Sequence, residues 1–214
     1  MEGSNPRRGS GVYYWRKPYF RTLKDVAAEA GAFPEWAEYA AFCTKYELGL
    51  RKQAFAALDR FVSVLERAPF AERRRFVSWL LPRADGREGQ HMLISHPLHL
   101  RVVEPTLLGW TLVEPECSEP HRWLGGYEHL KRAIELEPAD EIARRKLIVS
   151  ILSRVGFSIH ELPNGYLGKA REDLAALREA EALLEGLSSE EDRRELAVDI
   201  MEEKSLVEEY LRKK

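Results

Sequence analysis

Apolar residues recur at steps of three and four along most of this chain, and this helical period constrains the fold more than any other feature. After Pro34 the apolar face is Trp36, Tyr39, Phe42 and Tyr46. The next set has the same spacing and consists of Phe55, Leu58, Phe61, Val62 and Leu65. No long alternating Val/Ile/Thr run, which would be typical of a strand, interrupts the pattern. The sequence therefore predicts an all-α protein.

Prolines and glycines divide the pattern into about nine or ten predicted helices. We expect them near 22–31, 34–49, 50–66, 71–81, from 105 onward, and over 118–124, 127–137, 140–154, 170–184 and 190–211. Pro82 is expected to end the fourth helix, and Ser188 and Glu191 to form a capping box for the last. The longest connections are 83–97 and 156–168. We expect a basic and aromatic arm, 1–21, and a single all-helical domain, 22–214, with a possible division near 83–97.

Composition excludes several classes of protein. The 33 basic and 35 acidic residues give a net charge of −2, which excludes a globally basic nucleic-acid binder. No apolar run approaches the length of a membrane-spanning helix, and no secretory signal follows Met1. Cys43 and Cys117 lack CxxC partners, which excludes a disulfide framework, and Cys43 is expected to be buried. We expect a cytoplasmic protein without a membrane partner. The preference for Arg over Lys suggests a bacterial genome.

One stretch resembles part of a tetratricopeptide repeat. The run from Ala133 to Pro138 is similar to the end of the second repeat helix and its proline turn. In that register Trp110 occupies the tryptophan position and Gly126 the small position in the middle of a helix. Pro115 and Pro120 depart from the repeat, because they lie where its first helix runs unbroken.

A weaker match begins at Gly49 and includes Ala54 and Leu58, but it has Glu38 at the tryptophan position. The resemblance implies stacked antiparallel helical hairpins, either TPR-like or an irregular α-solenoid. Members of this family usually bind peptide or protein segments on a concave surface. A protein or peptide partner is therefore what the resemblance implies here.

Histidines are the first candidates for chemistry. His96 and His99 are three residues apart and could hold a metal with His91 or a remote carboxylate, although Pro97 lies between them. No HExxH motif is present. An alternative function is therefore a small helical enzyme, metal-dependent or acid–base, that uses His96, His99, His121 and His160. The simpler interpretation is that these histidines are polar loop residues, so no metal or other cofactor is expected.

Two further arrangements could support catalysis. His160 and Glu161 lie on a connection with Tyr166, and together these side chains could supply acid–base groups. Cys117 lies four residues before His121, but the acidic residues around it would raise the pKa of the thiol and oppose its use as a nucleophile.

Aromatic and basic residues occur together in two places. Arg122, Trp123 and Tyr127 surround the Gly125–Gly126 pair, where the tryptophan would serve either as a cap on the core or as a binding anchor. Trp15 and Arg16, in the arm, would either stack on nucleic-acid bases or dock on the helices.

Arg144, one turn into a predicted helix, is a candidate carboxylate clamp, although such residues are usually solvated. The favoured function is an interaction module without chemistry of its own, of the adaptor, regulator or toxin-neutralising type. A nucleic-acid binder that uses the arm is the third alternative. The predicted binding residues are Arg122, Trp123, Tyr127, His121, Arg144, His160, Tyr166, Trp15 and Arg16.

Overall fold

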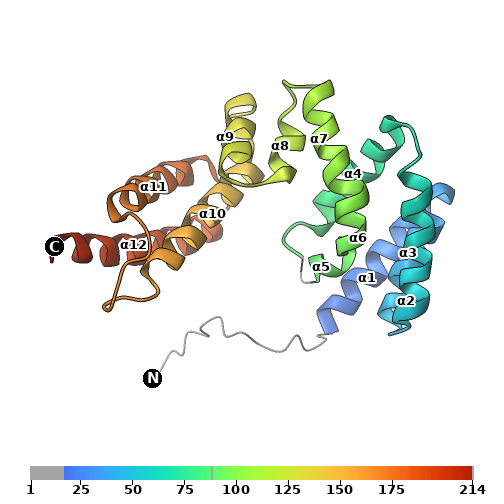
Figure 1. The fold of residues 1–214 in the computed structure, drawn as a ribbon, viewed down its shortest axis with the longest axis horizontal. Coiled ribbons are helices and arrows are strands. Elements are labelled where there is room, and N and C mark those ends of the chain that lie inside the picture. The colour runs from blue at the N-terminus through green and yellow to red at the C-terminus, as the bar shows by residue number, and fades with distance from the viewer. Residues whose placement is uncertain (1–16, 88, 214) are drawn as a thin grey trace. The chain divides into compact units, whose positions relative to one another are not determined.

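A computed structural model describes residues 17–87 and 89–213 (Figure 1). Every regular element in these ranges is a helix, and they contain no strand. The predicted all-α class is therefore confirmed. Contacts within the chain group it into two compact units, Met1–Thr106 and Leu107–Lys214. The division expected from the sequence lay earlier in the chain, near 83–97.

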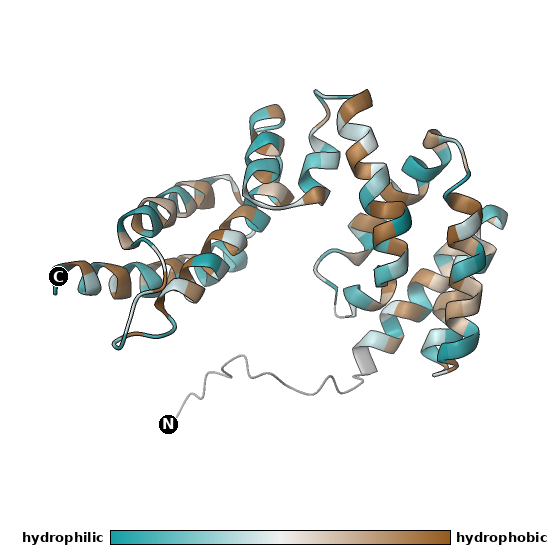
Figure 2. Cartoon of the chain, in the orientation of Figure 1, coloured by the Kyte–Doolittle hydropathy of each residue, from teal (hydrophilic) through white to brown (hydrophobic). Residues whose placement is uncertain are grey.

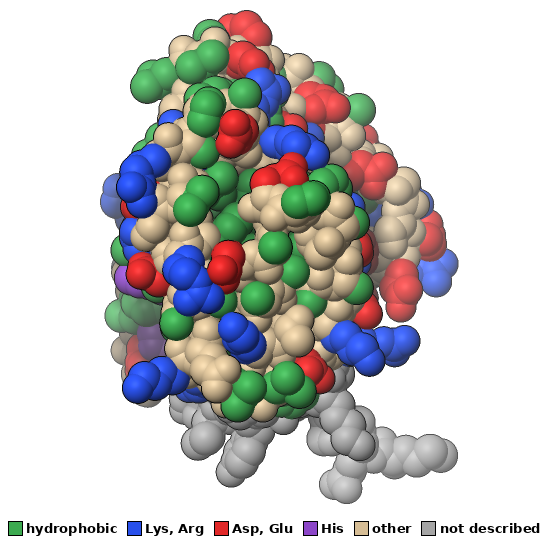
Figure 3. Space-filling view, turned by 90° about the vertical axis from the view of Figure 1, so that its right-hand side faces the viewer, with side chains coloured by type: hydrophobic (Ala, Val, Ile, Leu, Met, Phe, Trp, Pro, Cys, Tyr) green, Lys and Arg blue, Asp and Glu red, His purple; other side chains and the backbone are tan. Residues whose placement is uncertain are grey.

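The first unit is built on four long helices, α1 to α4, and a set of short ones. Helix α2 packs against both α1 and α3. The elements are α1 (Lys17–Ala30), a 3-10 turn (Pro34–Trp36), α2 (Ala37–Glu47), α3 (Arg51–Leu65), α4 (Phe70–Ala84), α5 (Gln90–Leu93), α6 (His96–Leu98) and a π-helical turn (His99–Val103). Figure 3 views this unit from the side where α2 and α3 lie, and hydrophobic side chains lie among charged ones on that face.

Aromatic side chains fill the core of the first unit. Tyr39 and Phe76 are fully buried, and each has its ring centroid within 5.5 Å of that of Phe61. The Tyr39 hydroxyl donates a hydrogen bond of 3.0 Å to the carbonyl oxygen of Leu93, which ties α2 to α5. Cys43 is fully buried, as expected, and burial raises the pKa of its thiol to about 12. The periodic apolar face read from the sequence is therefore the face that packs.

Three predicted boundaries in this unit are wrong. Helix α1 begins at Lys17, so residues 17–21 of the predicted arm are helical. Helix α4 continues through Pro82 to Ala84, because the missing N–H removes one hydrogen bond while Leu80, Leu81 and Ala84 remain buried. The connection expected over 83–97 contains α5 and the start of α6.

In the second unit α10 is central and packs against α9, α11 and α12. The elements are α7 (Glu104–Val113), which crosses the boundary between the units, α8 (Ser118–Leu124), α9 (Tyr127–Leu136), α10 (Glu141–Ile159), α11 (Ala170–Leu183), a 3-10 turn (Leu184–Gly186) and α12 (Glu190–Arg212). The pairs α8–α9, α9–α10 and α11–α12 are hairpins of sequence neighbours in contact. Hydrophobic residues alternate with hydrophilic ones around these helices (Figure 2). The buried faces of α9 to α12 form one hydrophobic core.

Two boundaries differ from the prediction here as well. Helix α10 extends to Ile159, which shortens the expected connection 156–168. The capping residue of α12 is Ser189, whose side chain accepts a hydrogen bond from the Asp192 amide, and not Ser188. Ser188 instead donates to a Glu141 carboxylate oxygen at 2.7 Å. The Ser188 hydroxyl, which was predicted to cap α12, therefore bonds to α10 instead.

Gly126 bears on the repeat resemblance. It lies directly before α9 with a φ of +72°, and not in the middle of a helix. This position therefore does not match the repeat. As for membranes, none of the helices in the described ranges combines the length and the apolar character needed for a span.

Candidate functional site

Arg122 is held inside the second unit by acidic side chains. Its Nε atom lies 2.6 Å from an Asp140 carboxylate oxygen, and Nη2 lies 3.4 Å from Glu137. The Asp140 side chain is only 2% exposed, and its other oxygen accepts the Ala143 amide at the start of α10. Arg122 therefore ties α8 to the start of α10, and its charge is neutralised within the fold.

Trp123 lies beneath two cations and is partly buried. The Lys146 ammonium is 4.0 Å from the ring centroid and the Arg122 guanidinium carbon is 5.8 Å from it. The indole Nε1 is buried, and among the described residues it has no hydrogen-bond partner. The ring therefore has cations of α8 and α10 over it, and its role as a cap on the core or as a binding anchor stays a prediction.

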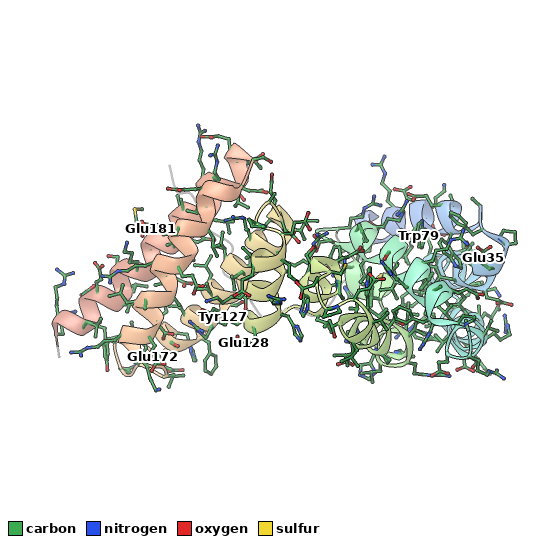
Figure 4. All side chains as sticks on the ribbon, turned by 90° about the horizontal axis from the view of Figure 1, so that it is seen from above. Glu35, Trp79, Tyr127, Glu128, Glu172 and Glu181 are labelled. Carbon is green, nitrogen blue, oxygen red and sulfur yellow. The ribbon has the colours of Figure 1, made fainter. Side chains whose placement is uncertain are left out.

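Tyr127, labelled in Figure 4, joins α9 to α11. Its hydroxyl donates a hydrogen bond of 2.6 Å to Glu179, and the Lys131 ammonium lies 3.2 Å from the same carboxylate. The hydrogen bond to Glu179, followed by desolvation, raises the pKa of Tyr127. The phenol therefore acts at neutral pH as a protonated donor that holds two hairpins together.

Arg144 has a similar structural role. Its Nε and Nη2 atoms donate hydrogen bonds of 3.0 and 2.7 Å to the Pro138 carbonyl oxygen. A Cβ atom added at Gly186 would lie 2.5 Å from the Arg144 guanidinium carbon, so this glycine leaves the room that the arginine occupies. The predicted carboxylate clamp instead holds the turn before α10.

His160 and Tyr166 do not meet as an acid–base pair. His160 is exposed, with Nδ1 2.6 Å from the Phe157 carbonyl oxygen and Nε2 3.0 Å from Glu161. Tyr166 donates a hydrogen bond of 2.8 Å to Asp173 on α11. Burial, and then that hydrogen bond, raise the pKa of Tyr166 well above its ordinary value. The two side chains therefore have separate partners.

Two surface hollows lie beside Tyr210, and Tyr166 lines one of them. The first, of about 360 Å³, is lined by Leu162, Pro163, Leu206, Glu209, Tyr210 and Lys213. The second, of about 650 Å³, is lined by Tyr166, Gly168, Lys169, Ala170, Arg171, Glu172, Tyr210 and Leu211. The rings of Tyr166 and Tyr210 stack with centroids 4.8 Å apart, and Tyr210 lines both hollows. We call this region the tyrosine surface.

Sequence reasoning found Tyr166 but missed Leu206 and Tyr210. The signal was available in part, because Leu206 is out of step with the buried positions Ile200 and Val207 of α12 and is 44% exposed. The stacking of Tyr210 on Tyr166 joins residues 44 apart, which no local pattern indicates.

The histidines form one close pair. His121 on α8 and His129 on α9 have their Nδ1 atoms 2.9 Å apart and their ring centroids 5.2 Å apart. Desolvation by burial, followed by the charges of His129 and Arg132, lowers the pKa of His121. The sequence had singled out His121 without this partner.

His96 is the first residue of α6 and His99 the first of the π-helical turn that follows it, and both are exposed. Among the described residues, no group of three or more His, Cys, Asp and Glu side chains is arranged to hold a metal ion. Trp15 and Arg16 lie outside the described residues, so the predicted arm contacts stay predictions.

Similarity to known proteins adds nothing to these geometric observations. The sequence matches no protein-family model, no curated protein and no solved structure.

Proposed function

We propose that this protein is an α-helical interaction module of the adaptor or regulator type, which binds a segment of another protein on the tyrosine surface. The observation that carries the proposal is the pair of hollows that Tyr210 lines, one mainly apolar and one with charged walls. An apolar anchor of the partner would enter the first hollow, and its polar neighbours would meet the second. Burial of such anchors supplies most of the affinity in protein interfaces.

The two rings are already held in place before a partner arrives. The Tyr166 hydroxyl donates to Asp173, and the ring stacks on Tyr210. A surface that loses little side-chain freedom on binding retains more of its contact energy as affinity. Leu206, which is 44% exposed, gains burial when a partner covers it.

The polar groups near this surface favour binding over catalysis. His160 is engaged with Phe157 and Glu161, and Tyr166 has a raised pKa that keeps its hydroxyl protonated at neutral pH. Neither group is placed to exchange a proton with the other. This supports a surface that recognises a segment through shape and charge.

Selection from a library of random displayed peptides tests the proposal on the full chain. Peptides that bind the parent protein are then titrated by fluorescence anisotropy against Leu206→Glu and Tyr210→Ala. Because each change removes apolar contact at the centre of the surface, we expect at least about tenfold weaker binding. Met201→Glu is the matched control, since Met201 is on the same helix, is 63% exposed and lines neither hollow.

The control should bind like the parent. Enriched peptides that bind Leu206→Glu as tightly as the parent would contradict the placement of the site. A selection that enriches no peptide would count against the function itself.

A further inference from the structure

His121 and His129 bring two imidazole nitrogens together from different helices. The hairpin between α8 and α9 turns at Gly125 and Gly126, and this turn places the two rings against each other. Their Nδ1 atoms are 2.9 Å apart, which is the length of a hydrogen bond between one protonated and one unprotonated nitrogen.

From this geometry we propose that His121 and His129 form a binding site for one borderline divalent metal ion, Zn²⁺, Ni²⁺ or Cu²⁺. Imidazole nitrogen is a preferred ligand of all three ions. On binding, the proton of the donating Nδ1 moves to Nε2 of the same ring through solvent, both Nδ1 atoms ligate the ion, and water completes its coordination. The site rests on the side-chain geometry of α8 and α9 and is independent of the tyrosine surface.

The distance between the nitrogens is close to what a metal ion requires. With metal–nitrogen bonds of about 2.0–2.1 Å and a tetrahedral angle, two ligand nitrogens lie about 3.4 Å apart. The observed 2.9 Å therefore has to open by about 0.5 Å, and rotation of the two partly buried rings has to supply this opening. The two ligands are thus held near their bound positions by the fold.

The charges around the two histidines are balanced. Arg132 contributes a nearby positive charge, which would repel a metal ion. Its guanidinium lies 3.4 Å from Glu116 and 3.4 Å from Glu135. These two carboxylates offset the repulsion that Arg132 would exert on a cation.

A bound ion would link α8 to α9 across their glycine turn. Because such an ion binds the folded hairpin and the ligands separate on unfolding, it stabilises the protein by mass action. The expected signature is a rise in melting temperature that depends on the metal concentration.

Titration of the full chain with Zn²⁺ and with Ni²⁺ by isothermal calorimetry tests the site. We expect one ion per chain in the parent protein, and at least about tenfold weaker binding in His121→Gln and in His129→Gln. Glutamine preserves a hydrogen-bonding side chain, so these variants are expected to fold; circular dichroism checks this. The melting temperature should rise with metal in the parent and not in either variant.

Three matched variants separate this site from the other candidate ligands. His160→Ala and the double variant His96→Gln/His99→Gln remove histidines outside the pair, and Cys117→Ser removes the thiol four residues before His121. All three should bind as the parent does. The proposal is overturned if the parent binds neither ion, if His121→Gln retains the binding, or if the loss follows the controls instead.

Discussion

Asp173 is a buried carboxylate that contacts several parts of the second unit. The Tyr166 hydroxyl donates a hydrogen bond of 2.8 Å to it, and Arg154 Nε lies 3.7 Å away. A Cβ atom at Gly168 would lie 2.7 Å from its carboxylate and would collide with the Ser158 hydroxyl, so only glycine fits there. These contacts hold the connection before α11 against the end of α10 and position one wall of the tyrosine surface.

The raised pKa of Tyr166 has a direct consequence for stability against pH. A tyrosine whose pKa is higher in the folded state stabilises the fold below its unfolded value of about 10, and that contribution is lost as the pH rises further. We expect Tyr166→Phe to lose about 1 kcal/mol at pH 7, with the hydrogen bond to Asp173, and to decline less steeply above pH 10.

Urea unfolding at pH 7, 9 and 10.5 measures both effects. Tyr39 and Tyr127 also have raised pKa values and remain in the variant, so its decline should become shallower without disappearing. Parallel declines in the parent and the variant would contradict the assignment.

At the scale of elements, residues at the helix ends determine how neighbouring helices of the second unit pack. Gly125 and Gly126 have φ values of +69° and +72° with ψ values of −163° and 160°, a region open almost only to glycine. They turn the chain so that α8 packs on α9 and the two histidines meet. Asp140 then caps α10 while it neutralises Arg122, which joins α8 to the start of α10.

Gly126→Ala is expected to lower the free energy of unfolding by about 2 kcal/mol, because a Cβ atom strains the backbone at this φ and ψ. The Cβ atom itself would meet nothing within 4 Å, so the loss reports conformation and not collision. Gly165→Ala is the control, since its surroundings are equally open and its φ is not positive. Chemical denaturation should show a change within about 0.5 kcal/mol there. Equal losses at both positions would refute the argument.

At the scale of the whole molecule, the chain forms two compact units with different cores. The core of the first is rich in aromatic rings that contact one another, among them Tyr39, Phe61 and Phe76. The core of the second is built from aliphatic residues of α9 to α12, such as Leu147 and Leu177. Every predicted binding residue that the structure describes belongs to the second unit.

Separate cores predict separate local stabilities. Leu58→Ala removes a buried side chain of α3 and should cost about 3 kcal/mol. Hydrogen exchange followed by mass spectrometry should then show faster exchange in α2 and α3, with α10 and α11 unchanged. Leu177→Ala is the reciprocal variant and should affect α9 to α12 alone. Uniform acceleration throughout the chain in either variant would show that the units unfold together.

The sequence by itself determined the helical class, the apolar faces and most helix positions, since these follow from local periodicity and from proline and glycine breaks. Its errors lie at helix ends, where burial outweighed a local signal, as at Pro82. Apart from Gly126, which does not match, the repeat register stays a prediction, as do the cytoplasmic location and the function. Only the tertiary structure decided which polar residues meet, because Arg122 with Asp140, His121 with His129 and Tyr166 with Tyr210 are contacts between elements. Such contacts depend on how helices pack, and no local spacing encodes the packing.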